Sequence, residues 1–204
     1  MIGIVDYGLG NLTSVAGAVV KLGYRPRITA DPGELSAAEK LILPGVGAFG
    51  DGMTNLSKRG LVDLLNDLVL KRRKPILGIC LGFQLLGASS EEFGHTKGLR
   101  WIDAAVTPLQ PDDAALRLPH VGWNEVSQTG TSILFDSIAD RSLFYFVHKF
   151  RLGTPTDASV VGTCDYGGPF TAAVQKGNIF GTQFHPEKSQ QAGLALLRNF
   201  LERA

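Results

Sequence analysis

A cysteine stands at the centre of a five-residue pattern that places nucleophiles in enzymes. The pattern, Gly78-Ile79-Cys80-Leu81-Gly82, follows the apolar segment Pro75–Ile79 and precedes the helix-like segment Phe83–Ala88. Such a nucleophile elbow forces its central residue into a strained backbone conformation, and glycine two residues to either side removes side-chain clashes. The elbow would set the Cys80 sulfur at a helix N-terminus, which favours a thiolate. The N–H of Leu81 would then be positioned to bind an oxyanion.

The chain has one other cysteine, Cys164, and it lacks this context. Free cysteine is among the most buried residue types, so Cys164 is interpreted as a small buried strand residue. The same interpretation is open for Cys80 taken alone, but the flanking glycines and the strand–turn–helix context favour a nucleophile there.

A nucleophilic thiol needs a base, and one of the four histidines stands out. His185 lies just past the strand-like segment Ile179–Phe184, where catalytic groups sit on parallel-type sheets. Glu187 follows after a proline and could accept one imidazole N–H, which would leave the other nitrogen to the thiol. A loop histidine beside a solvated glutamate is the alternative for either residue alone. The combination with Cys80 favours a triad.

An oxyanion hole needs a second donor, and a glycine loop offers one. Pro44-Gly45-Val46-Gly47 directly follows the strand-like Lys40–Leu43, as the second oxyanion loop does in nucleophile-elbow enzymes. An ordinary glycine turn is the other interpretation of this segment.

The elements that would position these groups alternate in the first half of the chain. Short apolar or β-branched runs predict strands, and a helix capped by Thr13 or Ser14 would end at Leu22, before Gly23. A second helical pattern extends from Met53 to Leu68. The order predicts a doubly wound α/β arrangement; its strands are Ile2–Tyr7, Tyr24–Ile28, Lys40–Leu43 and Pro75–Ile79.

The second half predicts short strands separated by turns, and then a helix from about Ala192 to Arg203. We therefore expect residues 1–204 to form one α/β domain with three layers around a mixed, mostly parallel sheet. The strands expected in this half are Val106–Leu109, Asn124–Val126, Leu143–Phe150, Ser159–Cys164, Phe170–Gln175 and Ile179–Phe184.

Composition excludes several classes of protein. The 204 residues carry 20 Lys and Arg against 19 Asp and Glu, so no strong field favours a nucleic acid or an anionic membrane surface. Two cysteines form at most one disulfide, which excludes a disulfide-stabilised secreted scaffold. The N-terminus shows no signal peptide, and no apolar run in the sequence is long enough to span a bilayer. We expect a soluble cytoplasmic protein whose thiols are reduced.

Three motifs in chain order resemble those of the class I, triad-type glutamine amidotransferases, which hydrolyse glutamine to glutamate and ammonia. They are Pro-Gly-Val-Gly at 44–47, Gly-Ile-Cys-Leu-Gly-Phe-Gln at 78–84 and Gln-Phe-His-Pro-Glu at 183–187. Nearly the whole chain also resembles the glutaminase subunits of imidazole glycerol phosphate synthases. This second resemblance rests on Asp6-Tyr7-Gly8-Leu9-Gly10-Asn11-Leu12, Pro119-His120-Val121-Gly122-Trp123-Asn124, Tyr145-Phe146-Val147-His148 and Phe170-Thr171-Ala172-Ala173-Val174.

The resemblance implies a role for each matching residue. Cys80 would form a glutamyl thioester, His185 would activate the thiol and protonate ammonia, and Glu187 would orient His185. The substrate glutamine would be held by Gly45, Gly47, Leu81, Gln84 and His148. The resemblance implies no cofactor and no metal. It implies a heterodimer with a cyclase subunit, a (β/α)8 barrel, that makes imidazole glycerol phosphate and an aminoimidazole carboxamide ribotide in histidine biosynthesis; that partner would face Asn11, Trp123, Tyr145 and Lys188.

Some alternatives stay open. Trp123 and Tyr145 could instead be part of the core. Lys188 could instead be an ordinary solvated surface charge. After Phe-Val-His the family usually continues with Ser or Thr and then Tyr, whereas Lys149 and Phe150 follow here. A paralogous ammonia donor for another synthase, such as an aminosugar enzyme, is therefore the runner-up. A stand-alone cysteine hydrolase fits Gln84 and the glycine loop less well, and a relic scaffold has no reason to keep all three triad residues.

Overall fold

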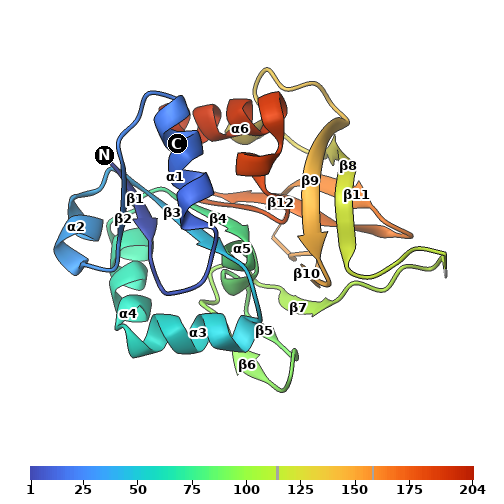
Figure 1. The fold of residues 1–204 in the computed structure, drawn as a ribbon. Helices are drawn as coiled ribbons and strands as arrows, with labels where there is room; N and C mark the ends of the chain where they lie inside the picture. The colour runs from blue at the N-terminus through green and yellow to red at the C-terminus, as the bar shows by residue number, and fades with distance from the viewer. Residues whose placement is uncertain (114, 158) are drawn as a thin grey trace.

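The computed structural model describes residues 1–113, 115–157 and 159–204, and its largest feature is a nine-stranded mixed sheet (Figure 1). The strand order is β2-β1-β3-β4-β13-β12-β11-β8-β9. Strands β2, β1, β3, β4 and β13 pair in parallel, and the rest continue antiparallel. The strands are β1 (Ile2–Val5), β2 (Pro26–Thr29), β3 (Lys40–Gly45), β4 (Ile76–Cys80), β8 (His120–Gln128), β9 (Ser142–His148), β11 (Val160–Asp165), β12 (Pro169–Lys176) and β13 (Ile179–Thr182).

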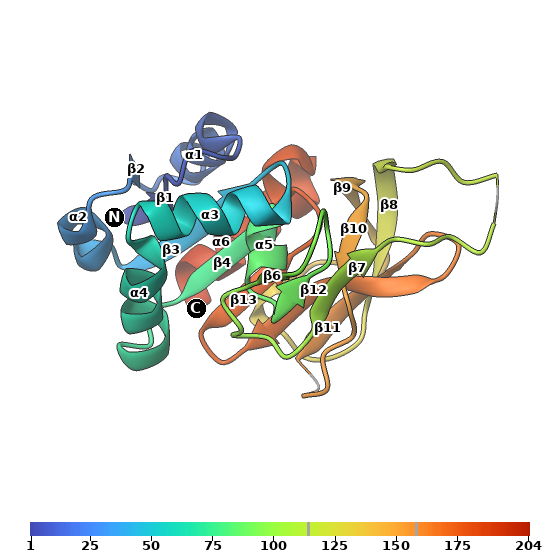
Figure 2. The same ribbon diagram turned by 90° about the horizontal axis from the view of Figure 1, so that it is seen from below.

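Helices cover both faces of the parallel half of this sheet. In Figure 1, α1 and α6 lie on one side and α3, α4 and α5 on the other; Figure 2 shows the antiparallel strands β8, β9 and β11 at the opposite end from α1, α2 and α4. The α/β class and the mixed sheet expected from the sequence are confirmed, although the antiparallel share is larger than expected. The helices are α1 (Leu12–Lys21), α2 (Pro32–Ala37), α3 (Phe49–Lys58), α4 (Leu61–Asn66), α5 (Leu81–Leu85) and α6 (Gln190–Arg203).

Successive residues of the parallel strands pack in two different buried apolar clusters. Ile42 packs in one buried cluster with Val19 of α1 and Leu197 of α6, whereas the next residue, Leu43, packs in the other with Leu56 of α3. Successive strand residues point to opposite faces, so a strand covered on both sides reads as a continuous apolar run. The segment 76–80 is accordingly buried at every position.

A second, four-stranded sheet has the order β10-β7-β5-β6, and its strand β10 contacts β12 of the large sheet. Its strands are β10 (Phe150–Leu152), β7 (Ala105–Pro108), β5 (Ser89–Ser90) and β6 (Thr96–Lys97). In the described part of the chain, no helix has the length and hydropathy of a bilayer span.

Several boundary predictions were wrong, and three of the differences have a clear physical reason. Helix α1 is capped by Asn11, whose Oδ1 accepts from the Ser14 N–H, and not by Thr13 or Ser14 themselves. The helical pattern from residue 53 to 68 is interrupted at Gly60, whose φ of 66° lies in the left-handed region and starts α4. The expected strand Leu143–Phe150 breaks at residue 149, which separates β9 from β10.

Candidate active site

Cys80 forms the elbow expected from its sequence context. It ends β4 and directly precedes α5, with φ 55° and ψ −109°, a conformation that non-glycine residues seldom adopt. A Cβ on Gly82 would lie 1.7 Å from the Leu43 carbonyl oxygen, and one on Gly78 would lie 2.8 Å from the Gly82 carbonyl oxygen. The two glycines are therefore required by close backbone approach, as the pattern predicted.

The glycine loop lies against this elbow. Gly45 is paired with Cys80 in the parallel register of β3 and β4, and a Cβ on Gly45 would lie 2.9 Å from the Gly82 nitrogen. Gly47 has a φ of 108°, which side chains rarely tolerate. The loop thus brings backbone that only glycine readily adopts next to the elbow.

His185 and Glu187 form a buried pair after β13. The His185 Nδ1 is 2.8 Å from the Glu187 Oε1, and the two side chains are 2% and 1% exposed. A carboxylate only accepts, so Nδ1 carries the proton. The His185 Nε2 is buried with no hydrogen-bond partner among the described residues, which leaves that nitrogen for a thiol proton.

The electrostatics of this pair include Cys80. Burial acts to lower the pKa of His185, but interaction with the anionic forms of Cys80 and Glu187 outweighs burial and raises it to about 9. The thiol also lies 3.9 Å from the Val147 carbonyl oxygen and 3.9 Å from the Gln183 Nε2. The raised pKa makes His185 a stronger base for the Cys80 thiol proton.

A cavity of about 290 Å³ opens beside Cys80. Five of the residues expected at the site line it: Gly47, Cys80, Leu81, Gln84 and His148. Two residues of opposite charge, Glu92 and Lys149, also line it. The rest of the lining comes from Val46, Pro119, Val147 and Phe150.

Gln84 is held by its amide group. Its Nε2 donates to the Phe150 carbonyl oxygen at 2.8 Å and to the Gln183 Oε1 at 3.1 Å. His148 also reaches the Phe150 carbonyl, since its Nδ1 lies 2.9 Å from that oxygen. Burial lowers the pKa of His148 to about 3, so this imidazole is neutral and serves as a hydrogen-bonding group.

Sequence reasoning missed Glu92, Gln183 and His120. The Glu92 Oε2 accepts from the Phe49 N–H, 2.8 Å away at the start of α3. Gln183 lies within the motif that ends in His185, so its position was a usable signal. Glu92 comes from a loop with no pattern around it, and only the fold brings it to the cavity.

The residues expected to face a partner gather at the edge strand β9. The Trp123 and Tyr145 rings meet edge to face at 6.0 Å, and the Lys188 Nζ lies 5.8 Å from the Tyr145 ring centre. Trp123 is 45% exposed, which excludes core packing for that residue. Asn11 stands apart as the cap of α1, a helix that packs against the turn containing Lys188.

This edge is connected to the buried pair. The backbone N–H of His185 donates to the Tyr145 carbonyl oxygen at 2.9 Å, and the Tyr145 N–H donates to the Ser189 hydroxyl at 2.9 Å. Strand β9, which carries Tyr145, therefore also positions the backbone of His185.

Comparisons with known proteins identify the family and the fold. The family model described as glutamine amidotransferase class-I matches residues 3–204. The chain is 45% identical to imidazole glycerol phosphate synthase subunit HisH 2 of Methanococcus maripaludis, covering all of both chains. It is 47% identical to subunit HisH of Moorella thermoacetica, covering 98% of this chain and 94% of that one. A solved glutamine amidotransferase has the same fold, with a TM-score of 0.77 at 18% identity over 98% of this chain and 97% of that one.

Proposed function

The chain belongs to the class I glutamine amidotransferase family, and relatives 45% and 47% identical to it are named as subunits of imidazole glycerol phosphate synthases; from this premise we propose how it works. It hydrolyses glutamine in the cavity beside Cys80 and passes the ammonia to a cyclase subunit. That subunit uses the ammonia to make imidazole glycerol phosphate and an aminoimidazole carboxamide ribotide in histidine biosynthesis. The observation that carries the proposal is the strained Cys80 elbow next to the buried His185–Glu187 pair.

The chemistry proceeds in two halves. The Cys80 thiolate attacks the carboxamide carbon, and the N–H groups of Leu81 and Gly47 stabilise the oxyanion that forms. His185 gives a proton to the nitrogen as the C–N bond breaks, which releases ammonia and leaves a glutamyl thioester. Water then loses a proton to His185 and attacks the thioester carbon; the thiolate leaves and glutamate departs. Glu187 keeps the imidazole oriented throughout.

The residues that line the cavity bind the glutamine. Gln84 and His148 line it together with Gly47, and Gly45 supports the loop. The amino-acid end of glutamine carries one positive and one negative group. Glu92 and Lys149 both line this cavity, and their opposite charges suit a zwitterion. Lys149 stands where the family usually has Ser or Thr.

The cyclase, a (β/α)8 barrel, docks on the face around the edge strand β9. Val121 and Trp123 on β8 and Leu143 on β9 are 55%, 45% and 52% exposed. The two strands are paired, and exposed apolar side chains that lie together mark interaction sites. Tyr145 and Lys188 extend the same surface. Docking there would act on His185 through the Tyr145 carbonyl.

A second candidate is an ammonia donor for a different synthase, such as an aminosugar enzyme. One observation favours it: Lys149 and Phe150 depart from the family pattern. The two candidates share the glutaminase chemistry and differ in the acceptor of the ammonia.

One experiment separates the two candidates. The purified chain is mixed with a barrel cyclase, and glutamate release is measured with and without the ribonucleotide substrate of the cyclase. We expect very low activity for the isolated chain and a large rise with the loaded cyclase. High activity without any partner would contradict the coupling, and glutaminase activity that this cyclase does not change would favour the second candidate.

A further inference from the structure

We propose that His120 is a positioning residue of the glutamine cavity, which it holds in shape through a chain of directed hydrogen bonds. The inference rests on the proposed function, since it takes glutamine to be the ligand of that cavity. His120 begins β8 and is 2% exposed. Its ring lies between those of Tyr166 and Phe146, with centroids 3.9 and 4.9 Å away. Stacking from two sides fixes the plane in which its nitrogens act.

The direction of every bond in the chain follows from one carbonyl. The Phe150 carbonyl oxygen only accepts, so the His148 Nδ1 at 2.9 Å must carry a proton. A neutral imidazole has one N–H, so the Nε2 of His148 accepts. The nitrogen that faces it at 3.2 Å is the His120 Nδ1, which therefore donates.

The hydrogen bonds on the other side of His120 follow from the same count of donors and acceptors. The His120 Nε2 is left as an acceptor, and the side-chain amide of Asn124 lies 3.4 Å from it. The other amide proton of Asn124 goes to the Asp165 carbonyl oxygen at 2.8 Å. Burial lowers the pKa of His120 to about 4, and that of His148 lies lower still. Both rings are therefore neutral near pH 7.

The hydrogen bonds at the Phe150 carbonyl shape the cavity. The Phe150 carbonyl that His148 holds also accepts from the Gln84 Nε2 at 2.8 Å. Gln84, His148 and Phe150 all line the cavity beside Cys80. Without the His120 donor, His148 could place its proton on Nε2 and release this carbonyl. Only part of the molecules would then hold the arrangement that binds glutamine, and the apparent affinity falls by that fraction.

Two substitutions separate the hydrogen bond from the packing. His120→Phe keeps an aromatic ring between Tyr166 and Phe146 but removes the donor. We expect it to raise KM for glutamine about tenfold, the effect of one lost buried hydrogen bond, with kcat of glutamine hydrolysis changed less than about threefold. His120→Asn returns an N–H close to the original Nδ1 and should recover most of the lost affinity.

These variants are assayed in the complex with the cyclase subunit and its ribonucleotide. Tyr166→Phe is the matched control, because it keeps the ring on His120 and removes only the hydroxyl that donates to the Arg117 carbonyl; its KM should equal that of the wild type. An unchanged KM in a folded His120→Phe protein would overturn the proposal. So would a rise in KM that His120→Asn shares in full.

The tautomers give a test that does not depend on activity. Nitrogen NMR of the imidazoles in the wild-type chain should show His148 and His120 both protonated at Nδ1. A His148 protonated at Nε2 would overturn the chain of hydrogen bonds, even if the His120 variants failed to fold. If the wild-type complex released no glutamate from glutamine, the proposed function would fail while the tautomers could still be as expected.

Discussion

The glycine after Leu81 allows the elbow geometry to be tested by a single methyl group. A Cβ on Gly82 would lie 1.7 Å from the carbonyl oxygen of Leu43 and 2.7 Å from its carbonyl carbon. Both atoms belong to the backbone of β3, which is paired with β1 and β4, so they cannot rotate away as a side chain would. Overpacking costs about 1–3 kcal/mol, and contact with fixed backbone belongs at the upper end.

We therefore expect Gly82→Ala to lower the free energy of unfolding by about 3 kcal/mol. In a chain of this size each kcal/mol moves the thermal midpoint by about 2–4 °C, which predicts a loss of roughly 10 °C. Scanning calorimetry and urea titration measure the two quantities. Glutamine hydrolysis should be lost as well, because Cys80 could not keep its position.

Gly17→Ala is the matched control. Gly17 is exposed in α1, and no described atom lies within 4 Å of a Cβ built there. Alanine is favoured over glycine inside a helix by about 0.8–1 kcal/mol, so this variant should gain stability. A Gly82→Ala protein within about 1 kcal/mol of the wild type would refute the reasoning about the elbow.

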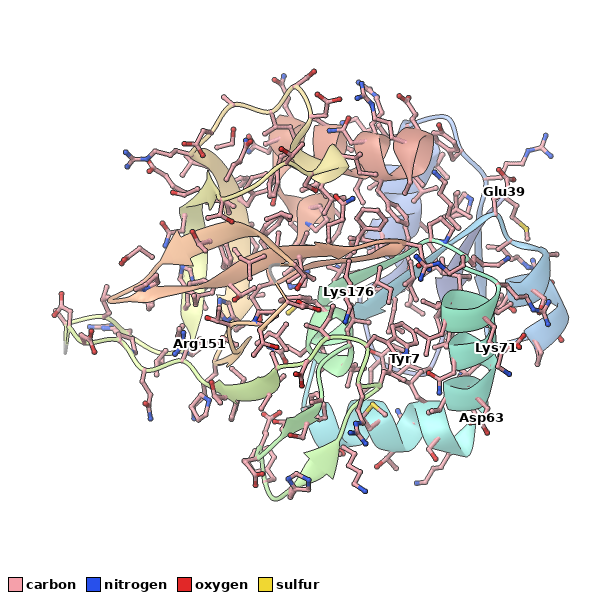
Figure 3. The ribbon with its side chains drawn as sticks, turned by 180° about the vertical axis from the view of Figure 1, so that it is seen from behind. Tyr7, Glu39, Asp63, Lys71, Arg151 and Lys176 are labelled. Carbon is pink, nitrogen blue, oxygen red and sulfur yellow. The ribbon has the colours of Figure 1, made fainter. Side chains whose placement is uncertain are left out.

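Three further predictions concern buried groups. The Tyr7 hydroxyl lies in the interior (Figure 3) and has no hydrogen-bond partner in the described part of the chain, so Tyr7→Phe should raise the free energy of unfolding by about 1 kcal/mol; a clear loss in urea titration would show an unseen partner. Burial raises the pKa of Cys164 to about 12, so iodoacetamide near neutral pH should modify Cys80 and spare Cys164; peptide mass spectrometry that found Cys164 modified first would contradict this. Unfolded histidines take up protons near pH 6.5, but His120 and His148 do so only near pH 4 and pH 3. Between pH 6.5 and pH 4 the unfolded chain therefore binds more protons than the folded chain. The free energy of unfolding should fall as the pH is lowered through this range, by up to about 1.4 kcal/mol per pH unit for each histidine. The same slope in His120→Phe would argue against the contribution of His120.

Local pattern was enough to predict the elements that are buried on both faces. The apolar run Pro75–Ile79 is typical of a strand covered on both faces, and the elbow after it follows from two glycines and a cysteine. Where the pattern carried no information, the prediction failed. Helical spacing continued through Gly60, although the left-handed backbone there divides the helix in two.

The site shows the same division. Cys80, His185 and Glu187 lie in motifs whose spacing expresses their chemistry, so they could be named from the sequence. The contact between His120 and His148 joins neighbouring strands in register, and that pairing is decided by the fold. Lys149 breaks the strand that the alternation predicted, because its carbonyl oxygen accepts from the Leu109 N–H at the edge of the other sheet.

The most direct measurement of the central claim is synthesis by the reconstituted Cys80→Ala complex with each nitrogen source. With glutamine, we expect synthesis to fall by a factor on the order of 10³ or more, because no other group can form the thioester. With added ammonia the rate should match that of the wild type, since the cyclase subunit is untouched. Cys164→Ala, which removes the other buried thiol, should retain both activities. Glutamine-dependent synthesis that persisted at the wild-type rate in Cys80→Ala would contradict the account.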